Sequence, residues 1–142
     1  MRKNLTIGDL GDLLERPLVA VLATLRRDGT VLLSPVWHEW RDDGFNVWIE
    51  RQDVKARHLR RDPRASIVVA ESDAPLRAIE VRGTVRFVEV DVSETALRIA
   101  SRYIGPEEAA AGVESLRGAD VIVRIEPGDL RAWDFADEYD TG

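Results

Sequence analysis

The chain has 142 residues, a formal net charge of −6 and no cysteine. This length predicts a single domain, residues 1–142, with one core. The absence of cysteine excludes disulfides, thiolate metal sites and a cysteine nucleophile, and two histidines are too few for a histidine-based metal cluster. No apolar run approaches the ~18 residues of a membrane span, and we see no signal peptide, so we expect a cytoplasmic protein. The acidic total disfavours general nucleic-acid binding.

The first half of the chain predicts a short helix followed by an antiparallel meander. Leucines at helical spacing indicate a helix over residues 6–16, which Pro17 ends. Three strands joined by tight turns are then expected over residues 18–26, 31–42 and 45–51. The pair Asp28 and Gly29 suits a hairpin turn with positive φ. Pro35 marks a bulge or an edge position in the second of these strands.

The second half mixes helices with longer strands. A helix over residues 54–62 is predicted to be capped by Asp53 and to end before Pro63. Further elements are expected as strands over 65–72 and 76–90 and helices over 93–105 and 106–118. Residues 120–135 are expected to form a strand, a turn and a short extended piece. Gly83, inside the long strand, indicates a bulge where the sheet bends sharply. Six or so strands with helices as plugs predict an α+β, mainly β protein built on a small antiparallel barrel with a closed or split sheet.

Residues 51–64 concentrate six Lys or Arg against two acids in an otherwise acidic chain. Within the predicted helix, Arg57 and Arg61 form an i,i+4 pair of like charges, which a bound anion would relieve. The free N–H groups and the dipole at the helix start also suit a phosphate. Two interpretations stay open from the residues alone. The segment is either an anion site or a solvated helix face whose start is satisfied by Asp53.

Four strings, in this order and spacing, resemble the pyridoxamine 5′-phosphate oxidase-like split β-barrel superfamily: VAVLATLRRDGTVLLSPVW, VKARHLRRDPRASIVV, AIEVRGTVRFVEV and VIVRIEPGDLRAWDF. Within it, they are most similar to the deazaflavin (coenzyme F420)-dependent oxidoreductases, and the similarity covers roughly residues 18–135. The resemblance implies a split antiparallel β-barrel of the FMN-binding type with short flanking helices. It also implies a homodimer with two cofactor sites in the clefts between the protomers.

The resemblance assigns the cofactor's phosphate to the basic helix. Lys55 and Arg57 match the family's basic pair in the pattern KxR. His58 falls where F420-binding relatives often have Asn, so it is a weaker match to the same site. Val54 stands where some relatives carry another Arg, which removes one possible phosphate contact.

The resemblance assigns the cofactor's ring to the second strand. The matching residues are Ser34, Pro35, Val36 and Trp37. Trp133 resembles an aromatic position that reaches the site from the partner chain. Trp37 and Trp40 lie three apart on a strand and should face opposite sides, so that one lines a cleft and the other packs in the core or at a dimer contact. His38 points away from Trp37 and is expected to be structural or exposed.

The functional hypothesis is an oxidoreductase that transfers a hydride between coenzyme F420 and a small organic acceptor. No catalytic side chain is assigned, since the cofactor carries the chemistry and the protein orients it. Two alternatives keep the fold. One is an FMN-binding flavoprotein oxidoreductase, and the other is a non-catalytic protein that binds F420 or haem. Neither nucleic acid nor a membrane is expected as a partner.

Overall fold

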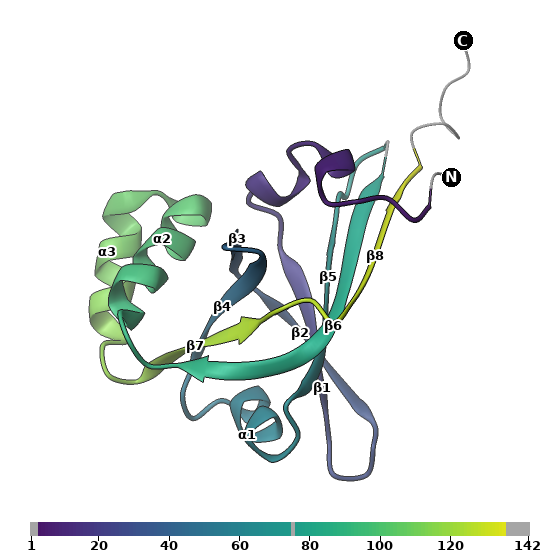
Figure 1. The fold of residues 1–142 in the computed structure, drawn as a ribbon. Helices are drawn as coiled ribbons and strands as arrows, with labels where there is room; N and C mark the ends of the chain where they lie inside the picture. The colour runs from purple at the N-terminus through teal and green to yellow at the C-terminus, as the bar shows by residue number, and fades with distance from the viewer. Residues whose placement is uncertain (1–2, 75, 136–142) are drawn as a thin grey trace.

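One curled antiparallel sheet of eight strands dominates the computed structural model, which describes residues 3–74 and 76–135 (Figure 1). The strands are β1 (Ala20–Leu25), β2 (Val31–Val36), β3 (His38–Arg41), β4 (Gly44–Glu50), β5 (Arg64–Ala70), β6 (Arg77–Val88), β7 (Asp120–Ile125) and β8 (Asp129–Asp134). Their order is β2-β1-β5-β6-β7-β4-β3, with β8 paired to β6 off this path. β2 and β3 lie at its two ends although only Trp37 separates them, so the sheet curls back on itself. The predicted split barrel is confirmed.

The expected strand over residues 31–42 is divided in two at Trp37. β2 pairs with β1, and β3 pairs with β4, so the meander runs through a corner rather than through one straight strand. Pro35 fits β2 because β2 is an edge strand with β1 as its neighbour, and an edge tolerates a residue without an N–H group. Of the two positions predicted for Pro35, the edge is the observed one.

β6 links the two halves of the barrel. Residues up to Thr84 pair with β5, whereas Val85 to Val88 pair with β7. Gly83 lies at this change of partners, where an added Cβ would collide with the main-chain oxygen of Glu126. The strand therefore turns from one half of the sheet to the other near Gly83, as expected. The predicted bulge is wrong, because β6 runs through Gly83 without a break and pairs with β5 one residue to one up to Thr84.

The three α-helices lie close to their predicted positions: α1 (Val54–Arg61), α2 (Val92–Ile104) and α3 (Pro106–Ser115). The predicted N-terminal helix is wrong. Two 3-10 helices, η1 (Gly8–Leu10) and η2 (Leu13–Glu15), replace it because Gly11 adopts a φ of 61° between them. The leucines of this segment are nevertheless buried, as their spacing predicted: Leu10, Leu13 and Leu14.

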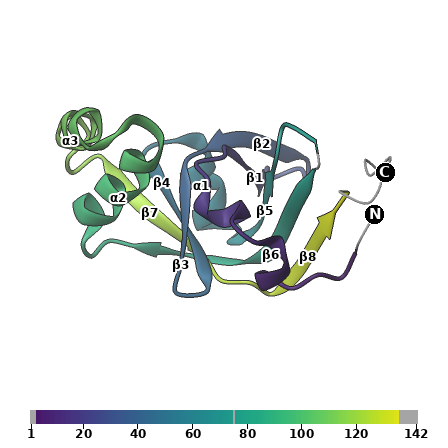
Figure 2. The same ribbon diagram turned by 90° about the horizontal axis from the view of Figure 1, so that it is seen from above.

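The core fills the inside of the curled sheet, and α2 with α3 covers the outer side of the β4–β7 end (Figure 2). The N-terminal segment crosses the opening of the barrel, and α1 lies against β1 at its other end. Every residue of β7 is buried because it has strands on both sides, core on one face and α2 on the other. Within residues 3–74 and 76–135, the helices are all too short or too polar to cross a bilayer.

Candidate functional site

A cleft of about 490 Å³ opens where the end of β4 and the start of α1 meet the corner between β2 and β3. Its volume lies within the range of roughly 300–1,000 Å³ that is usual for small-molecule sites. Four residues that the resemblance assigned to the cofactor line it together: Pro35, Val36, Trp37 and Lys55. The structure thus joins the predicted ring wall and one of the predicted phosphate ligands in one cavity.

The wall of the cleft is apolar and aromatic. Pro35 is exposed on the edge strand, Val36 is buried at 6% exposure, and Trp37 is half-buried at the corner. The indole of Trp37 stacks on Tyr103, with ring centroids 4.9 Å apart and planes 6° from parallel. Ser34, which was also predicted beside the ring, pairs with Leu22 of β1 and does not line the cleft.

The opposite side of the cleft carries charge. Asp53 caps α1, as predicted, by accepting a hydrogen bond from the main-chain N–H of Lys55 at 3.2 Å. The ammonium of Lys55 also lies 2.6 Å from the other carboxylate oxygen of Asp53. Burial acts to raise the pKa of Asp53, but the hydrogen bonds from Lys55 outweigh it and hold that pKa below its ordinary value. Glu50 lines the same side, so the cleft holds one cation and two carboxylates.

Arg57 and His58 lie outside this cleft. Arg57 is exposed, and its guanidinium has no hydrogen-bond or ion-pair partner among the described residues. His58 is buried, and its Nδ1 lies 3.0 Å from the hydroxyl of Thr24 on β1. Burial first, and then the neighbouring arginines, lower the pKa of His58, so the imidazole is neutral at neutral pH. His58 ties α1 to the sheet, and a role in the cofactor site stays a prediction for both residues.

Most of the other basic residues around α1 have fixed partners. Arg60 donates to the main-chain oxygen of Arg51 and lies over the ring of Phe87, while Arg61 donates to the oxygen of Leu25. Arg64 pairs with Asp62 at 2.7 Å. Most arginines of this segment therefore attach α1 to its surroundings. Lys55 is the basic residue of the segment that lines the cleft.

Trp133 is far from this cleft in the same chain. It lies on β8, under the guanidinium of Arg131 at 5.1 Å, and lines a separate cavity of about 350 Å³ next to Phe135 and the N-terminal segment. Figure 1 shows β8 and α1 at opposite ends of the molecule. A contribution of Trp133 to the cleft would have to come from a second chain, and it stays a prediction.

Several residues of the site were not found from the sequence. Trp48, whose Nε1 donates to Asp120 at 2.9 Å, lines the cleft from β4, and Leu116 lines it from the turn after α3. Tyr103, which stacks on Trp37 from α2, was not assigned to the site. Tyr103 and Leu116 are distant in the sequence from β2 and α1, so no local spacing connects them to the site, and Trp48, although close to α1, carried no sequence signal for it.

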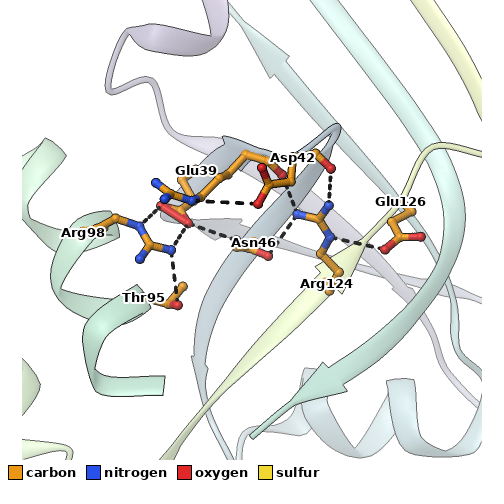
Figure 3. Close-up of polar contacts among 8 residues, drawn as sticks. Glu39, Asp42, Asn46, Thr95, Arg98, Arg124 and Glu126 are labelled. Carbon is orange, nitrogen blue, oxygen red and sulfur yellow. Dashed lines mark hydrogen bonds and ion pairs between the residues drawn. The ribbon is translucent and has the colours of Figure 1, made fainter. Parts of the chain in front are cut away.

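A second polar region lies across β3, β4 and β7 and is separate from the cleft (Figure 3). Glu39, at 6% exposure, accepts hydrogen bonds from Arg98 at 2.8 Å and from Asn46 at 2.9 Å. Arg124 donates to the oxygen of Asn46 at 3.3 Å and to two main-chain carbonyls of the β3–β4 turn at 2.6 Å each. Because the members bond to one another, this cluster is a structural one.

His38 has no place in an acid–base mechanism. It is fully buried, and burial first, with Arg102 second, lowers its pKa to about 3. It is therefore structural, which is one of the two expectations for it. Among the described residues, no group of three or more His, Cys, Asp or Glu side chains is placed to hold a metal ion. The cleft offers an apolar, aromatic wall opposite one ammonium and two carboxylates.

The eight-stranded sheet forms a split barrel, and the cleft lies beside its edge strand β2. The chain belongs to the pyridoxamine 5′-phosphate oxidase family, because the model of that family matches residues 9–134. It is similar to the conserved hypothetical protein Rv2991 from Mycobacterium tuberculosis, with 26% identity, a TM-score of 0.82 and coverage of 95% of this chain and 88% of that chain.

Two further structures show the range of proteins with this fold. One, called F420 reductase, shares 29% identity at a TM-score of 0.68, over 84% of this chain and 93% of that chain. The other, HutZ, the heme storage protein from Vibrio cholerae, shares 19% identity at a TM-score of 0.70, over 87% of this chain and 92% of that chain. The second likeness is evidence for the fold alone.

Proposed function

We propose that this protein is an oxidoreductase that holds coenzyme F420 in the cleft and transfers a hydride between it and a small organic acceptor. The observation that carries the proposal is the meeting of Lys55 with the wall formed by Pro35, Val36 and Trp37 in one cavity. A planar, anionic, ring-shaped cofactor needs both features. The similarity to an F420 reductase, at 29% identity, supports the same choice.

In this proposal each residue binds or orients. The ammonium of Lys55 attracts the anionic tail of the cofactor, and the α1 start adds the positive end of the helix dipole. Trp37 and Val36 give the ring an apolar surface and exclude water from it. The bound cofactor itself supplies the hydride chemistry. The buried, neutral His38 donates no proton to the acceptor in this scheme.

The charges of the cleft disfavour a doubly charged phosphate group more than a singly charged one. Glu50 and Asp53 face the same cavity as Lys55, so the lining has an excess of one negative charge. The terminal phosphate of FMN, with a second pKa of about 6, carries a charge of about −1.5 to −2 at neutral pH. F420 carries a phosphodiester with a single negative charge at this position of its tail. Repulsion by the two carboxylates should therefore penalise FMN more than F420.

We propose in addition that two chains associate, so that Trp133 of the partner subunit closes the cleft. Apolar side chains on the outer side of β1 and β2 support association, because Val19, Val31 and Leu33 are 51%, 48% and 64% exposed. Light scattering on the purified protein should give twice the mass of the 15.9 kDa chain. Trp133→Ala should weaken cofactor binding without changing that mass. A monomer that binds F420 at full affinity would contradict this part of the proposal.

A binding comparison tests the proposed cofactor. Purified protein is titrated with F420, FMN, riboflavin and haem, with cofactor fluorescence or absorbance as the signal. The proposal expects F420 to bind most tightly and FMN to bind no better than riboflavin, since the phosphate of FMN gains nothing in this cleft. Tight FMN binding would favour the flavoprotein alternative. Preferential haem binding would favour the non-catalytic one, as would F420 binding without turnover across a broad set of acceptors.

Arg57 is tested separately. It is the exposed cation of α1 without a partner among the described residues, and it can meet the cofactor tail outside the cleft. Arg57→Ala should weaken F420 binding by about 10-fold, as for a charge-assisted hydrogen bond. Arg64→Ala removes an equal charge from the neighbouring strand and is the matched control. Equal effects of the two substitutions would show that only net charge matters and would remove Arg57 from the site.

A further inference from the structure

Tyr103, in the last turn of α2, is not part of the cleft lining but contacts the residues that form it. Its helix belongs to the pair α2 and α3, which the chain inserts between β6 and β7 and which lies at one end of the molecule (Figure 2). The ring of Tyr103 stacks on Trp37 with centroids 4.9 Å apart and an angle of 6°. An offset stack of this kind fixes the plane of both rings. The cleft wall at Trp37 is therefore supported from behind by a helix.

The hydroxyl of Tyr103 bonds to two segments at once. It lies 2.9 Å from the main-chain oxygen of Leu18, which can only accept, so the hydroxyl hydrogen points there. The hydroxyl then accepts from His38, whose main-chain N–H lies at 3.2 Å and whose Nδ1 lies at 3.0 Å. Because His38 is neutral, its single ring hydrogen sits on Nδ1 in this arrangement, and all three contacts are satisfied together.

Both segments continue directly into the cleft. Leu18 precedes Val19, and His38 follows Trp37, and Val19 and Trp37 both line the cavity. A residue that only filled space behind the sheet would need the ring but not the hydroxyl. Tyr103 instead joins two separate parts of the lining through its oxygen and holds a third contact through its ring.

We propose that Tyr103 is a positioning residue of the cofactor cleft. It holds the indole plane of Trp37 and keeps the Val19 and Trp37 sides of the cavity in fixed relation, so that the ring of the cofactor meets a preformed wall. The inference rests on the function proposed above, in that the occupant of the cleft is a planar cofactor. The cleft wall is then preorganised, so that less free energy is lost in ordering it when the cofactor binds.

The test uses two variants and two matched controls on the same helix. Tyr103→Leu removes the stack and the hydroxyl, whereas Tyr103→Phe removes the hydroxyl alone. Ile99→Val removes about as much core volume as Tyr103→Leu, and Ile99→Ala removes more, one turn earlier at a fully buried residue that is no part of the cleft. Each protein is titrated with F420 and with FMN. Indole N–H signals of the four tryptophans are recorded by NMR and assigned with Trp37→Phe.

Tyr103→Leu should weaken binding of the cofactor by about 3- to 10-fold, the loss expected for one aromatic pair, and should shift and broaden the Trp37 indole signal. Tyr103→Phe should weaken cofactor binding less, and the Trp37 indole signal should shift but stay sharp. The Ile99 variants should lower the melting temperature without either effect. An unmoved Trp37 signal, or equal losses of affinity in the Ile99 and Tyr103 variants, would overturn the proposal. If the wild-type chain binds neither cofactor, the proposed function fails, and the indole signal alone decides whether Tyr103 positions Trp37.

Discussion

The cluster around Glu39 and Arg124 (Figure 3) and the start of α1 both set basic side chains against carboxylates, but they border different cavities. Glu39 and Arg98 line one of about 660 Å³ beside α2, whereas Asp53 and Lys55 line the cleft. In the cluster, the charges are buried or half-buried and are bonded to one another and to main-chain carbonyls. At the start of α1, Lys55 has one partner and Arg57 has none among the described residues. A charged side chain whose hydrogen bonds are made within the chain stabilises the fold, whereas a charged side chain with few partners can still bind a ligand.

The largest effect is expected from breaking the cluster. Arg124 is buried at 8% exposure, and Arg124→Leu removes the donor to two main-chain carbonyls and to Asn46, so the free energy of unfolding should fall by about 3 kcal/mol. Urea denaturation measures this loss. Because the cluster is separate from the cleft, affinity for F420 should stay within about twofold of wild type. A stable Arg124→Leu protein with much weaker cofactor binding would reverse the roles given to the two regions.

The substitution Glu39→Gln tests, through the pH dependence of stability, whether the cluster contains an ionised carboxylate. Burial acts to raise the pKa of Glu39, but hydrogen bonds from Arg98 and Asn46 outweigh it and lower the pKa from its ordinary 4.5. The stability that the ionised carboxylate contributes is therefore present above pH 4.5 and lost as the pH falls through the lowered value. At neutral pH the wild type should be more stable than Glu39→Gln by about 1–3 kcal/mol, and the difference should shrink in acid. A difference that stays constant with pH would show that Glu39 is not held as an ion.

Asp53→Ser is expected to act on the cleft with little effect on the fold. Serine is a good N-cap, so α1 should keep its start, while Lys55 loses the carboxylate that it now pairs with. Affinity for F420 should rise by about threefold, the value of a partly exposed ion pair. Melting temperature serves as the control for the cap. Weaker binding with an unchanged melting temperature would mean that Asp53 itself contacts the cofactor.

Arg64→Ala should have the smallest effect. Its side chain is 73% exposed and pairs with Asp62 outside the cleft. An exposed pair of this kind is screened by solvent. Neither the melting temperature nor the affinity for F420 should change measurably. A clear loss of F420 binding would place the anion site on the far side of α1 from Lys55.

The fold could be predicted where the signal is local. Gly29 adopts a φ of 86° in the expected turn, Asp53 caps the expected helix, and Pro35 lies on an edge strand. The prediction of an N-terminal helix was wrong because leucine spacing alone does not distinguish one helix from two short 3-10 turns. The division of the second strand at Trp37 was not predicted, because it depends on how the whole sheet closes.

The site could be predicted in part. Pro35, Val36, Trp37 and Lys55 came from the resemblance, and the structure places them in one cleft. Tyr103 could not be assigned to it, because its partner His38 is 65 residues away and the contact exists only after the sheet has curled. The buried hydrogen bond of His58 to Thr24 was not predicted either, because its place in a basic helix gives no signal for it.

One thermodynamic cycle tests the central claim most directly. F420 and its phosphate-free deazaflavin core are each titrated into wild-type protein and into Lys55→Ala. If Lys55 holds the anionic tail in the cleft, the wild type should prefer F420 over the core by roughly 10- to 100-fold, and Lys55→Ala should lose most of that preference while binding the core normally. An unchanged preference for F420 in Lys55→Ala would contradict the account.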